Sequence, residues 1–137
     1  MDETLHAAYL ATAYRVRLPR GGWATIRIGE IPPAGLLALA GPHPWGFVTA
    51  CNPRSRPLPR QRNRLAQRRL LAELRALPSA RAILPGLGVG DRGWREPSLF
   101  VVGPAPEALD KVASRHEQNA YVHGQARTPA RLRVLAP

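Results

Sequence analysis

The chain has 137 residues, enough for one domain with a sizeable core, and 45% of them are hydrophobic, which argues against wholesale disorder. It has no apolar run of about 18 residues, no signal-peptide pattern and one cysteine, Cys51. A membrane span and a disulfide framework within the chain are therefore excluded, and a cytoplasmic protein is expected. The formal net charge of +11 predicts attraction to polyanions, although Lys111 is the only lysine among the 20 basic residues, and the codon bias of a GC-rich genome also raises arginine content.

The first fifty residues predict a helix, a β-hairpin, a second helix and a buried strand. Apolar residues at helical spacing, with acids in the first turn, predict a helix over residues 3–12. Alternation over residues 13–18 and 23–29, around a Pro-Arg-Gly-Gly turn, predicts a hairpin with arginines on its outer face. A Pro-Pro pair starts a short helix over residues 34–40. The nearly continuous apolar run of residues 45–50 predicts a central strand that is buried on both faces.

An arginine-rich helix follows a polar turn, and this junction has the most groups able to touch a partner. Within residues 59–77, the apolar residues fall on one face, with Arg64 and Arg68 on the opposite one. Asn63 falls in the apolar sector, where a polar side chain needs partners. It is expected either to tie down a neighbouring loop or to form part of a site with Asn52.

The second half of the chain predicts several strands, a loop and a helix. Residues 81–84 predict a brief strand. Residues 85–94 are rich in glycine but lack the Gly-Lys-Ser/Thr ending of a phosphate-binding loop, so they predict a flexible rim loop. The remaining patterns predict strands over residues 98–102, 120–124 and 131–134, and a helix that starts at Pro104 and ends near Asn119, which is expected as its left-handed cap.

Together these elements predict a single α+β domain over residues 1–137. We expect a mixed or mainly antiparallel sheet of about six strands, with three to four helices packed on it. A small, partly open β-barrel with added helices is the alternative, because a helix is followed by consecutive strands in the N-terminal half. No internal repeat is visible, and nothing indicates a second domain.

The residues that carry reactive groups form no specific catalytic or metal-binding motif. The four histidines lack the spacing of paired ligands, so neither a metal nor a cofactor is expected. Cys51 lies at a predicted strand end without an obvious base, and a lone cysteine is most often a small buried hydrophobe. Ser55 and His123 lack the Gly-x-Ser-x-Gly elbow of a nucleophilic serine. Asp91 and Glu96 are the only nearby carboxylates in a loop, and paired acid–base catalysis requires different environments for them. An enzyme is therefore not favoured.

Nucleic-acid binding requires less specific chemistry, because arginines neutralise phosphates and planar groups stack on bases. The segment after Asn52 is dense in arginine, but the chain lacks the signatures of the common nucleic-acid-binding modules. We expect an accessory protein that binds RNA, or less readily DNA, mainly through backbone phosphates. A solvated helix face and a surface for an acidic protein partner are the alternatives, and the oligomeric state stays open. The expected nucleic-acid-binding residues are Arg54, Arg56, Arg60, Arg64 and Arg68.

Three short motifs follow one another along the chain: Thr49-Ala50-x-Asn52-Pro53-x-Ser55, then Gly88-Val89-Gly90 with Trp94-x-Glu96-Pro97-Ser98, and Gln118-Asn119-Ala120. In this combination the chain resembles a bacterial family catalogued as domain of unknown function 3293, over about residues 9–124. It departs from the family at Glu117, where glycine is usual, and at Cys51, where an aromatic residue is common. The resemblance implies a small bacterial α+β domain and brings no activity, substrate or cofactor.

The motif residues suggest a second kind of site, centred on the turn from Asn52 to Ser55. Most of them are small polar residues at the ends of predicted elements. If they converge, they would form a pocket that binds a small ligand or a nucleotide. The corresponding function is a small-ligand or nucleotide-processing enzyme. The alternative is that they are caps and turn anchors. The candidate pocket residues are Asn52, Ser55, Asn63, Glu96, Ser98, Gln118 and Asn119.

Overall fold

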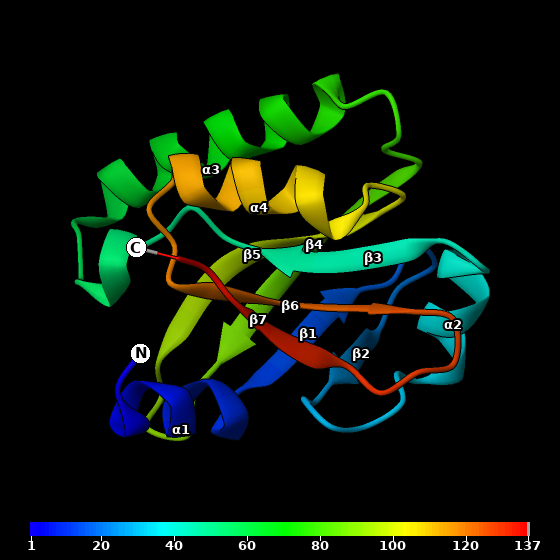
Figure 1. Ribbon diagram of the computed structural model, residues 1–137, viewed down its shortest axis with the longest axis horizontal. Coiled ribbons are helices and arrows are strands. Elements are labelled where there is room, and N and C mark those ends of the chain that lie inside the picture. The colour runs from blue at the N-terminus through cyan, green and yellow to red at the C-terminus, as the bar shows by residue number, and fades with distance from the viewer. Residues whose placement is uncertain (137) are drawn as a thin grey trace.

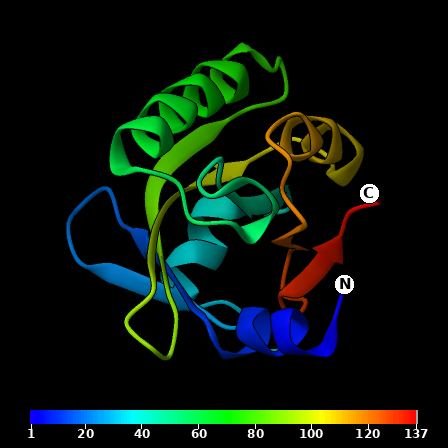
Figure 2. The same ribbon diagram turned by 90° about the vertical axis from the view of Figure 1, so that its left-hand side faces the viewer.

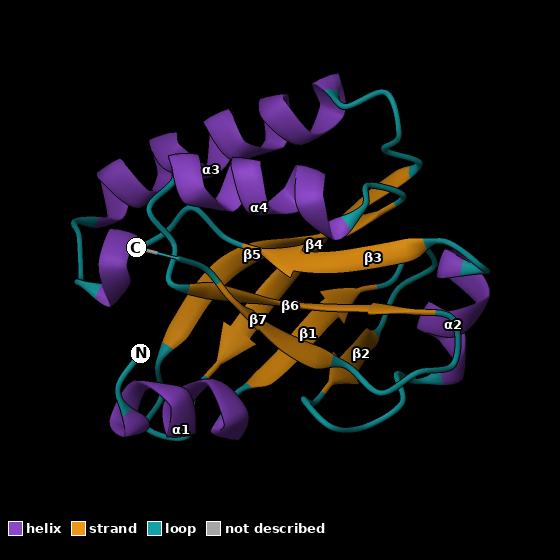
Figure 3. Cartoon of the chain, viewed as in Figure 1, coloured by secondary structure: helices purple, strands orange, loops and turns teal. Residues whose placement is uncertain are grey.

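Seven strands in residues 1–136, the part of the chain that the computed structural model describes, form one antiparallel sheet with the order β2-β1-β4-β5-β3-β6-β7 (Figure 1). Four α-helices accompany them in this part of the chain (Figure 3), which confirms an α+β fold with an antiparallel sheet and adds one strand to the expected number. The strands are β1 (Ala13–Arg17), β2 (Trp23–Ile26), β3 (Pro44–Val48), β4 (Ala82–Val89), β5 (Arg95–Val102), β6 (Ala120–Gln125) and β7 (Arg131–Val134). The helices are α1 (Glu3–Ala11), α2 (Ala34–Ala40), α3 (Arg60–Ala76) and α4 (Pro106–Arg115), with a 3-10 turn, η1, over Pro53–Ser55.

The sheet curls into a half-barrel with two buried faces, so the barrel-like alternative also describes it (Figure 2). Helices α3 and α4 cover the outer face, and the inner face encloses a second hydrophobic core. Successive side chains of a strand point to opposite faces of the sheet. In β6, accordingly, Val122 belongs to the inner core and Tyr121 to the outer one. Helices α1 and α2 lie at opposite ends of the curled sheet in Figure 1.

Strand β3 lies between β5 and β6 near the middle of the sheet, as its apolar run predicted. Its side chains reach both cores: Trp45 and Phe47 lie in the inner core and Val48 in the outer one. All three are almost completely buried. A strand covered on both faces needs apolar residues at successive positions, and β3 has them. The strand therefore fixes the position of the turn that follows it.

Helix α3 packs as the helical periodicity predicts. Leu70 and Leu74 are fully buried in the outer core, whereas Arg64 and Arg68 are exposed. The helix thus presents an arginine-rich surface to solvent and an aliphatic surface to the sheet.

The prediction of a glycine-rich loop over residues 85–94 is wrong for its first half. Strands β4 and β5 pair through Gly86↔Ser98 and Gly88↔Glu96, so residues 85–89 belong to the sheet. A Cβ atom built on Gly86 would lie 2.7 Å from the Phe47 ring. Glycine is therefore used here for close packing on the inner face, and only residues 90–94 form the connection between the two strands.

The left-handed residue after α4 is Glu117, with a φ angle of +53°, and the prediction of Asn119 in this role is wrong. The backbone N–H of Gln118 donates to the carbonyl oxygen of Ala113 at 3.1 Å, so the helix closes before Asn119 is reached. Glu117 thus adopts a positive φ, which only glycine adopts without strain.

The structure also bears on the expected absence of a membrane span. No helix within residues 1–136 combines the length and the apolar character needed to cross a lipid bilayer.

Candidate functional site

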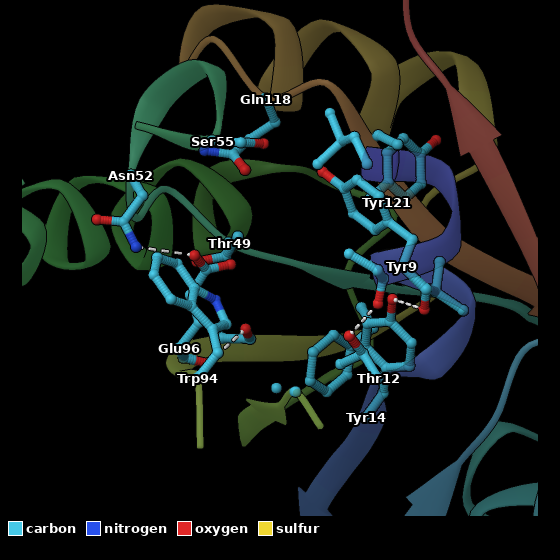
Figure 4. Close-up of a pocket in the computed structure, with 18 of the residues that line it drawn as sticks. Tyr9, Thr12, Tyr14, Thr49, Asn52, Ser55, Trp94, Glu96, Gln118 and Tyr121 are labelled. Carbon is cyan, nitrogen blue, oxygen red and sulfur yellow. Dashed lines mark hydrogen bonds between the residues drawn. The ribbon is translucent and has the colours of Figure 1, made fainter. Parts of the chain in front are cut away.

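A cavity of about 290 Å³ lies at one end of the inner face, between α1, the 52–55 turn and the ends of β4 and β5 (Figure 4). In that view Glu96 and Trp94 lie across the cavity from Tyr9 and Tyr14. Apolar and aromatic groups supply most of the surface of the wall, and polar side chains supply the rest. The apolar and aromatic lining includes Leu5, Ala8, Tyr9, Tyr14, Phe47, Trp94 and Val122, and the polar lining includes Thr12, Thr49, Asn52, Ser55, Asp91, Glu96, Ser98 and Gln118.

Five of the seven candidate pocket residues line this cavity: Asn52, Ser55, Glu96, Ser98 and Gln118. The other two lie behind the lining and hold it in place. Asn63 hydrogen-bonds Asn52, and the Asn119 amide donates to the Ser55 Oγ at 2.9 Å. The set therefore combines lining residues with their supports.

The Asn52 side chain joins three parts of the chain. Its Oδ1 accepts hydrogen bonds from the backbone N–H of Leu58 at 2.9 Å and from the Asn63 Nδ2 at 2.7 Å. Its Nδ2 donates to the Glu96 Oε2 at 2.9 Å. The Asn63 Oδ1 accepts in turn from the Asn52 backbone N–H at 2.9 Å. Asn63 thus satisfies its polar side chain by tying the turn to α3.

The 52–55 turn has an unusual backbone. Asn52, Arg54 and Ser55 have φ angles of +49°, +57° and +60°, in the left-handed region that residues other than glycine seldom adopt. The loop after α4 clamps this turn, because the Arg54 N–H donates to the Glu117 carbonyl at 2.8 Å and the Gln118 Nε2 donates to the Cys51 carbonyl at 3.0 Å. The surrounding contacts therefore hold a strained conformation in place.

Glu96 is the ionisable group at the centre of the polar wall, and it is partly buried. Burial raises the pKa of its carboxyl, and the Asn52 amide and the Trp94 side chain oppose that rise. None of the salt bridges within residues 1–136 involves Glu96. Its hydrogen-bonding partner, the Asn52 amide, is neutral, so the charge of an ionised Glu96 lacks a counterion in this wall.

The opposite wall comes from α1 and β1, which sequence reasoning did not connect to a site. Burial raises the pKa of the Tyr9 hydroxyl, and the Ser55 side chain opposes the rise. The Tyr14 hydroxyl donates to the Tyr9 carbonyl at 2.7 Å. Helix α1 contains no buried residue, because its apolar face borders a cavity instead of a filled core. The spacing of Leu5 and Tyr9 predicted that face, but not what it covers.

Cys51 and His123 do not line the cavity. The Cys51 thiol is buried, and burial raises its pKa, which favours the protonated and unreactive form. No group of three or more metal-binding side chains occurs in the described part of the chain. The ionisable groups of the lining are the carboxylates Glu96 and Asp91 and tyrosine hydroxyls.

The five candidate nucleic-acid-binding arginines lie apart from the cavity lining. Each of them is exposed, and none takes part in a salt bridge within residues 1–136. Arg54 lies in η1 and Arg56 directly follows it, whereas Arg60, Arg64 and Arg68 lie in the N-terminal part of α3.

Comparisons with known proteins give a family and no activity. The family described as "Protein of unknown function (DUF3293)" matches residues 48–121, more than half of the chain. No curated protein and no solved structure matched. The matched segment contains Asn52, Ser55, Glu96, Ser98 and Gln118, the polar candidates of the cavity wall. It begins after β1, so the wall formed by Tyr9 and Tyr14 (the tyrosine wall) lies outside it. On this match the chain belongs to the DUF3293 family of proteins of unknown function.

Proposed function

We propose that this protein binds a small ligand in the cavity between α1 and the 52–55 turn. The observation that carries the proposal is the cavity itself: about 290 Å³, with a wall surface that is mostly apolar and with polar side chains that converge on it. Small-molecule sites in proteins have this composition, and their volumes begin at roughly 300 Å³. The ligand is therefore small.

Two further observations support the proposal. The left-handed conformations of Asn52, Arg54 and Ser55 cost roughly 1–3 kcal/mol each, and such strain clusters at binding and catalytic sites. Burial also raises the pKa of the Glu96 carboxyl, and perturbed carboxyls in cavities are typical of functional sites. We propose binding and no reaction, and the described lining contains no cysteine, lysine or histidine.

A substitution at Gly88 tests the proposal, because this residue lies on β4 and lines the cavity. A Cβ atom there makes only ordinary contacts, at 3.7 Å from the Glu96 carbonyl oxygen and 3.9 Å from the Thr12 methyl group. Alanine therefore fits, and the longer side chain of Gly88→Leu extends into the cavity.

A fragment library screened by NMR is expected to give ligands that shift the Trp94 indole signal. Gly88→Leu is expected to weaken these ligands about tenfold or more, an effect of about 1.4 kcal/mol, while Gly88→Ala binds like the unmodified protein. Melting curves of both variants show that the fold is kept. Absence of any fragment that shifts Trp94, or equal binding to Gly88→Leu, would contradict the proposal.

We propose nucleic-acid binding as a second function, at the exposed arginines that run from η1 along α3 and do not themselves line the cavity. The exposure of these arginines and their lack of salt bridges within residues 1–136 support it, since their charge is available to phosphates. Cytoplasmic location also stays a prediction.

Fluorescence anisotropy with labelled RNA, single-stranded DNA and duplex DNA, over a salt series, tests this second function. The double variant Arg64→Glu with Arg68→Glu is expected to weaken RNA binding about tenfold or more and to flatten its salt dependence. A control that changes the net charge equally, Arg20→Glu with Arg127→Glu, alters two exposed arginines in other turns. Equal loss in both double variants, or binding that vanishes near physiological salt, would mean that the charge acts only as a general field.

A further inference from the structure

The cavity is lined by acidic side chains, although the chain as a whole is basic. The chain has a formal net charge of +11, yet the described lining contains the carboxylates Glu96 and Asp91 and no arginine, lysine or histidine. A ligand that enters this cavity therefore meets acidic groups, whatever the sign of the outer surface.

We propose that the ligand is a small organic cation, with an ammonium or amidinium group placed at Glu96 and a flat or aliphatic body between the aromatic walls. This inference rests on the proposed function of the cavity and adds the chemical class of its ligand.

The hydrogen bonds of Glu96 support the position of the cationic group. One carboxylate oxygen, Oε2, accepts from the neutral Asn52 amide at 2.9 Å, and the Ser98 hydroxyl donates to the Glu96 backbone carbonyl at 3.0 Å and not to the carboxylate. In a partly buried carboxylate without a cationic partner, neutral donors replace the lost hydration only in part. A bound cation with N–H donors supplies both the missing charge and the missing hydrogen bonds.

The aromatic walls suit the rest of such a ligand. Tyr9 and Tyr14 lie across the cavity from Trp94 in Figure 4, and Phe47 also lines it. Aromatic faces attract cations and pack against flat apolar groups. Trp94 is 44% exposed, so its ring is available to a ligand at the edge of the cavity.

The same lining disfavours anions. A phosphate or carboxylate in the cavity would lie near Glu96 and Asp91 without any basic side chain of the lining to neutralise it. The positive field of the outer surface does not reverse this, because exposed charges are screened beyond about 8–10 Å at physiological salt. Contacts inside a partly buried site are screened less. The charged phosphates of a nucleotide are therefore poor occupants.

A matched set of three probes tests the inference: phenethylamine, phenethyl alcohol and phenylacetate, titrated by calorimetry at pH 7. We expect phenethylamine to bind about tenfold more tightly than the alcohol, and phenylacetate to bind most weakly. Glu96→Gln keeps an oxygen acceptor for the Asn52 amide and removes the charge, so it is expected to abolish the advantage of the amine over the alcohol. Asp91→Asn is the matched control for loss of one negative charge.

A pH series on the unmodified protein gives a readout independent of any variant. The amino group of phenethylamine is an ordinary alkylamine, like that of lysine, whose pKa is about 10.4. It therefore stays protonated between pH 4 and 8. The raised pKa of Glu96 means that the affinity for the amine increases as pH rises through that pKa, while the affinity for the alcohol stays flat. The other titratable groups near Glu96 are Asp91, Tyr9, Tyr14 and Cys51, and burial raises the pKa of the tyrosines and the thiol, so they stay neutral here. Asp91→Asn must therefore keep the pH dependence and Glu96→Gln must lose it.

The outcomes separate the two proposals. Tighter or equal binding of phenethyl alcohol or phenylacetate would overturn the cationic ligand and leave the cavity as a ligand site. An advantage of the amine that survives in Glu96→Gln would overturn the role of Glu96. If none of the three probes binds, the charges of the fragment-screen hits test the inference. A predominance of neutral or acidic hits contradicts the cationic ligand. A screen without hits contradicts both proposals.

Discussion

Asn52→Ala is expected to lower the free energy of unfolding by about 2–4 kcal/mol, because it leaves several partly buried groups without partners. The lost bonds join Asn52 to the Leu58 backbone, to Asn63 and to Glu96. Alanine also has to adopt the left-handed φ of +49°, which costs about 1–2 kcal/mol more than in the right-handed region. Chemical denaturation measures the loss. An unchanged midpoint and slope would show that the amide network does not hold the turn.

Two matched variants divide this effect into its causes. Asn52→Gly loses the same three bonds but adopts a positive φ without strain, so it is expected to be more stable than Asn52→Ala by about 1 kcal/mol. Asn52→Asp keeps the acceptor for Leu58 and Asn63 and places a second carboxylate beside Glu96. Two adjacent carboxylates raise the pKa of one of them further.

The Asn52→Asp variant has a defined pH dependence. The pKa of Glu96 is raised in the folded protein, so the folded state binds more protons than the unfolded state between the two pKa values. Stability therefore decreases as pH rises from the unfolded value through the folded one. The introduced carboxylate enlarges this effect, so Asn52→Asp is expected to lose most stability at neutral pH and to approach the unmodified protein in acid. A constant difference at all pH values would contradict this account.

The sequence was sufficient for features that repeat with a regular period. The face of α3 that buries Leu70 and Leu74, and the alternation that places Val122 and Tyr121 on opposite faces of β6, both follow from local spacing. The antiparallel sheet also followed, because short connections between successive strands favour hairpins over crossovers, as between β1 and β2.

The cavity was only partly predictable, because its walls come from segments far apart in the chain. The motif residues predicted part of the polar wall. They did not predict its contacts, since the hydrogen bond between Asn52 and Glu96 joins positions 44 residues apart. The tyrosine wall was missed, since the apolar face of α1 has the same spacing whether it covers a core or an empty space. Local periodicity predicts which face turns inward, and the tertiary arrangement decides what that face meets.

The glycines of β4 were misinterpreted for a related reason. Glycine clusters usually mark turns, so residues 85–94 were predicted as a loop. In the structure Gly86 lies in β4. A glycine is needed at this position because the Phe47 ring fills the space that a side chain would occupy. Phe47 is distant in sequence, so no local pattern distinguishes this packing glycine from a turn glycine.

Gly86→Ala is expected to lower the free energy of unfolding by about 1–3 kcal/mol, the usual cost of overpacking a well-filled core. The added Cβ would lie 2.7 Å and 3.0 Å from two atoms of the Phe47 ring, and 3.3 Å from the Arg15 carbonyl oxygen. The Tyr14 ring packs edge-on against Phe47 at a centroid distance of 5.3 Å, which limits movement of the ring on that side. Thermal and chemical denaturation measure the loss.

Gly88→Ala, on the same strand and the same face, is the matched control, because its Cβ makes no close contact. It is expected to stay within about 0.5 kcal/mol of the unmodified protein. Equal effects of the two alanines would mean that residues 85–89 tolerate side chains as a loop does. Adding Phe47→Leu should reduce the penalty of Gly86→Ala, since a smaller side chain removes the clash, and a double-mutant cycle measures that coupling.

Gly86→Ala and Gly88→Ala are also expected to differ in ligand binding. The Phe47 ring, which packs against Gly86, belongs to the inner core and also lines the cavity. A ring displaced by the new Cβ at position 86 can move only where there is space, and the adjacent space is the cavity. Gly86→Ala should therefore weaken fragment binding as well as stability, whereas Gly88→Ala should change neither. A loss of stability in Gly86→Ala with unchanged fragment affinity would show that the strand yields instead of the ring, and that the wall of the cavity is set independently of the packing beneath it.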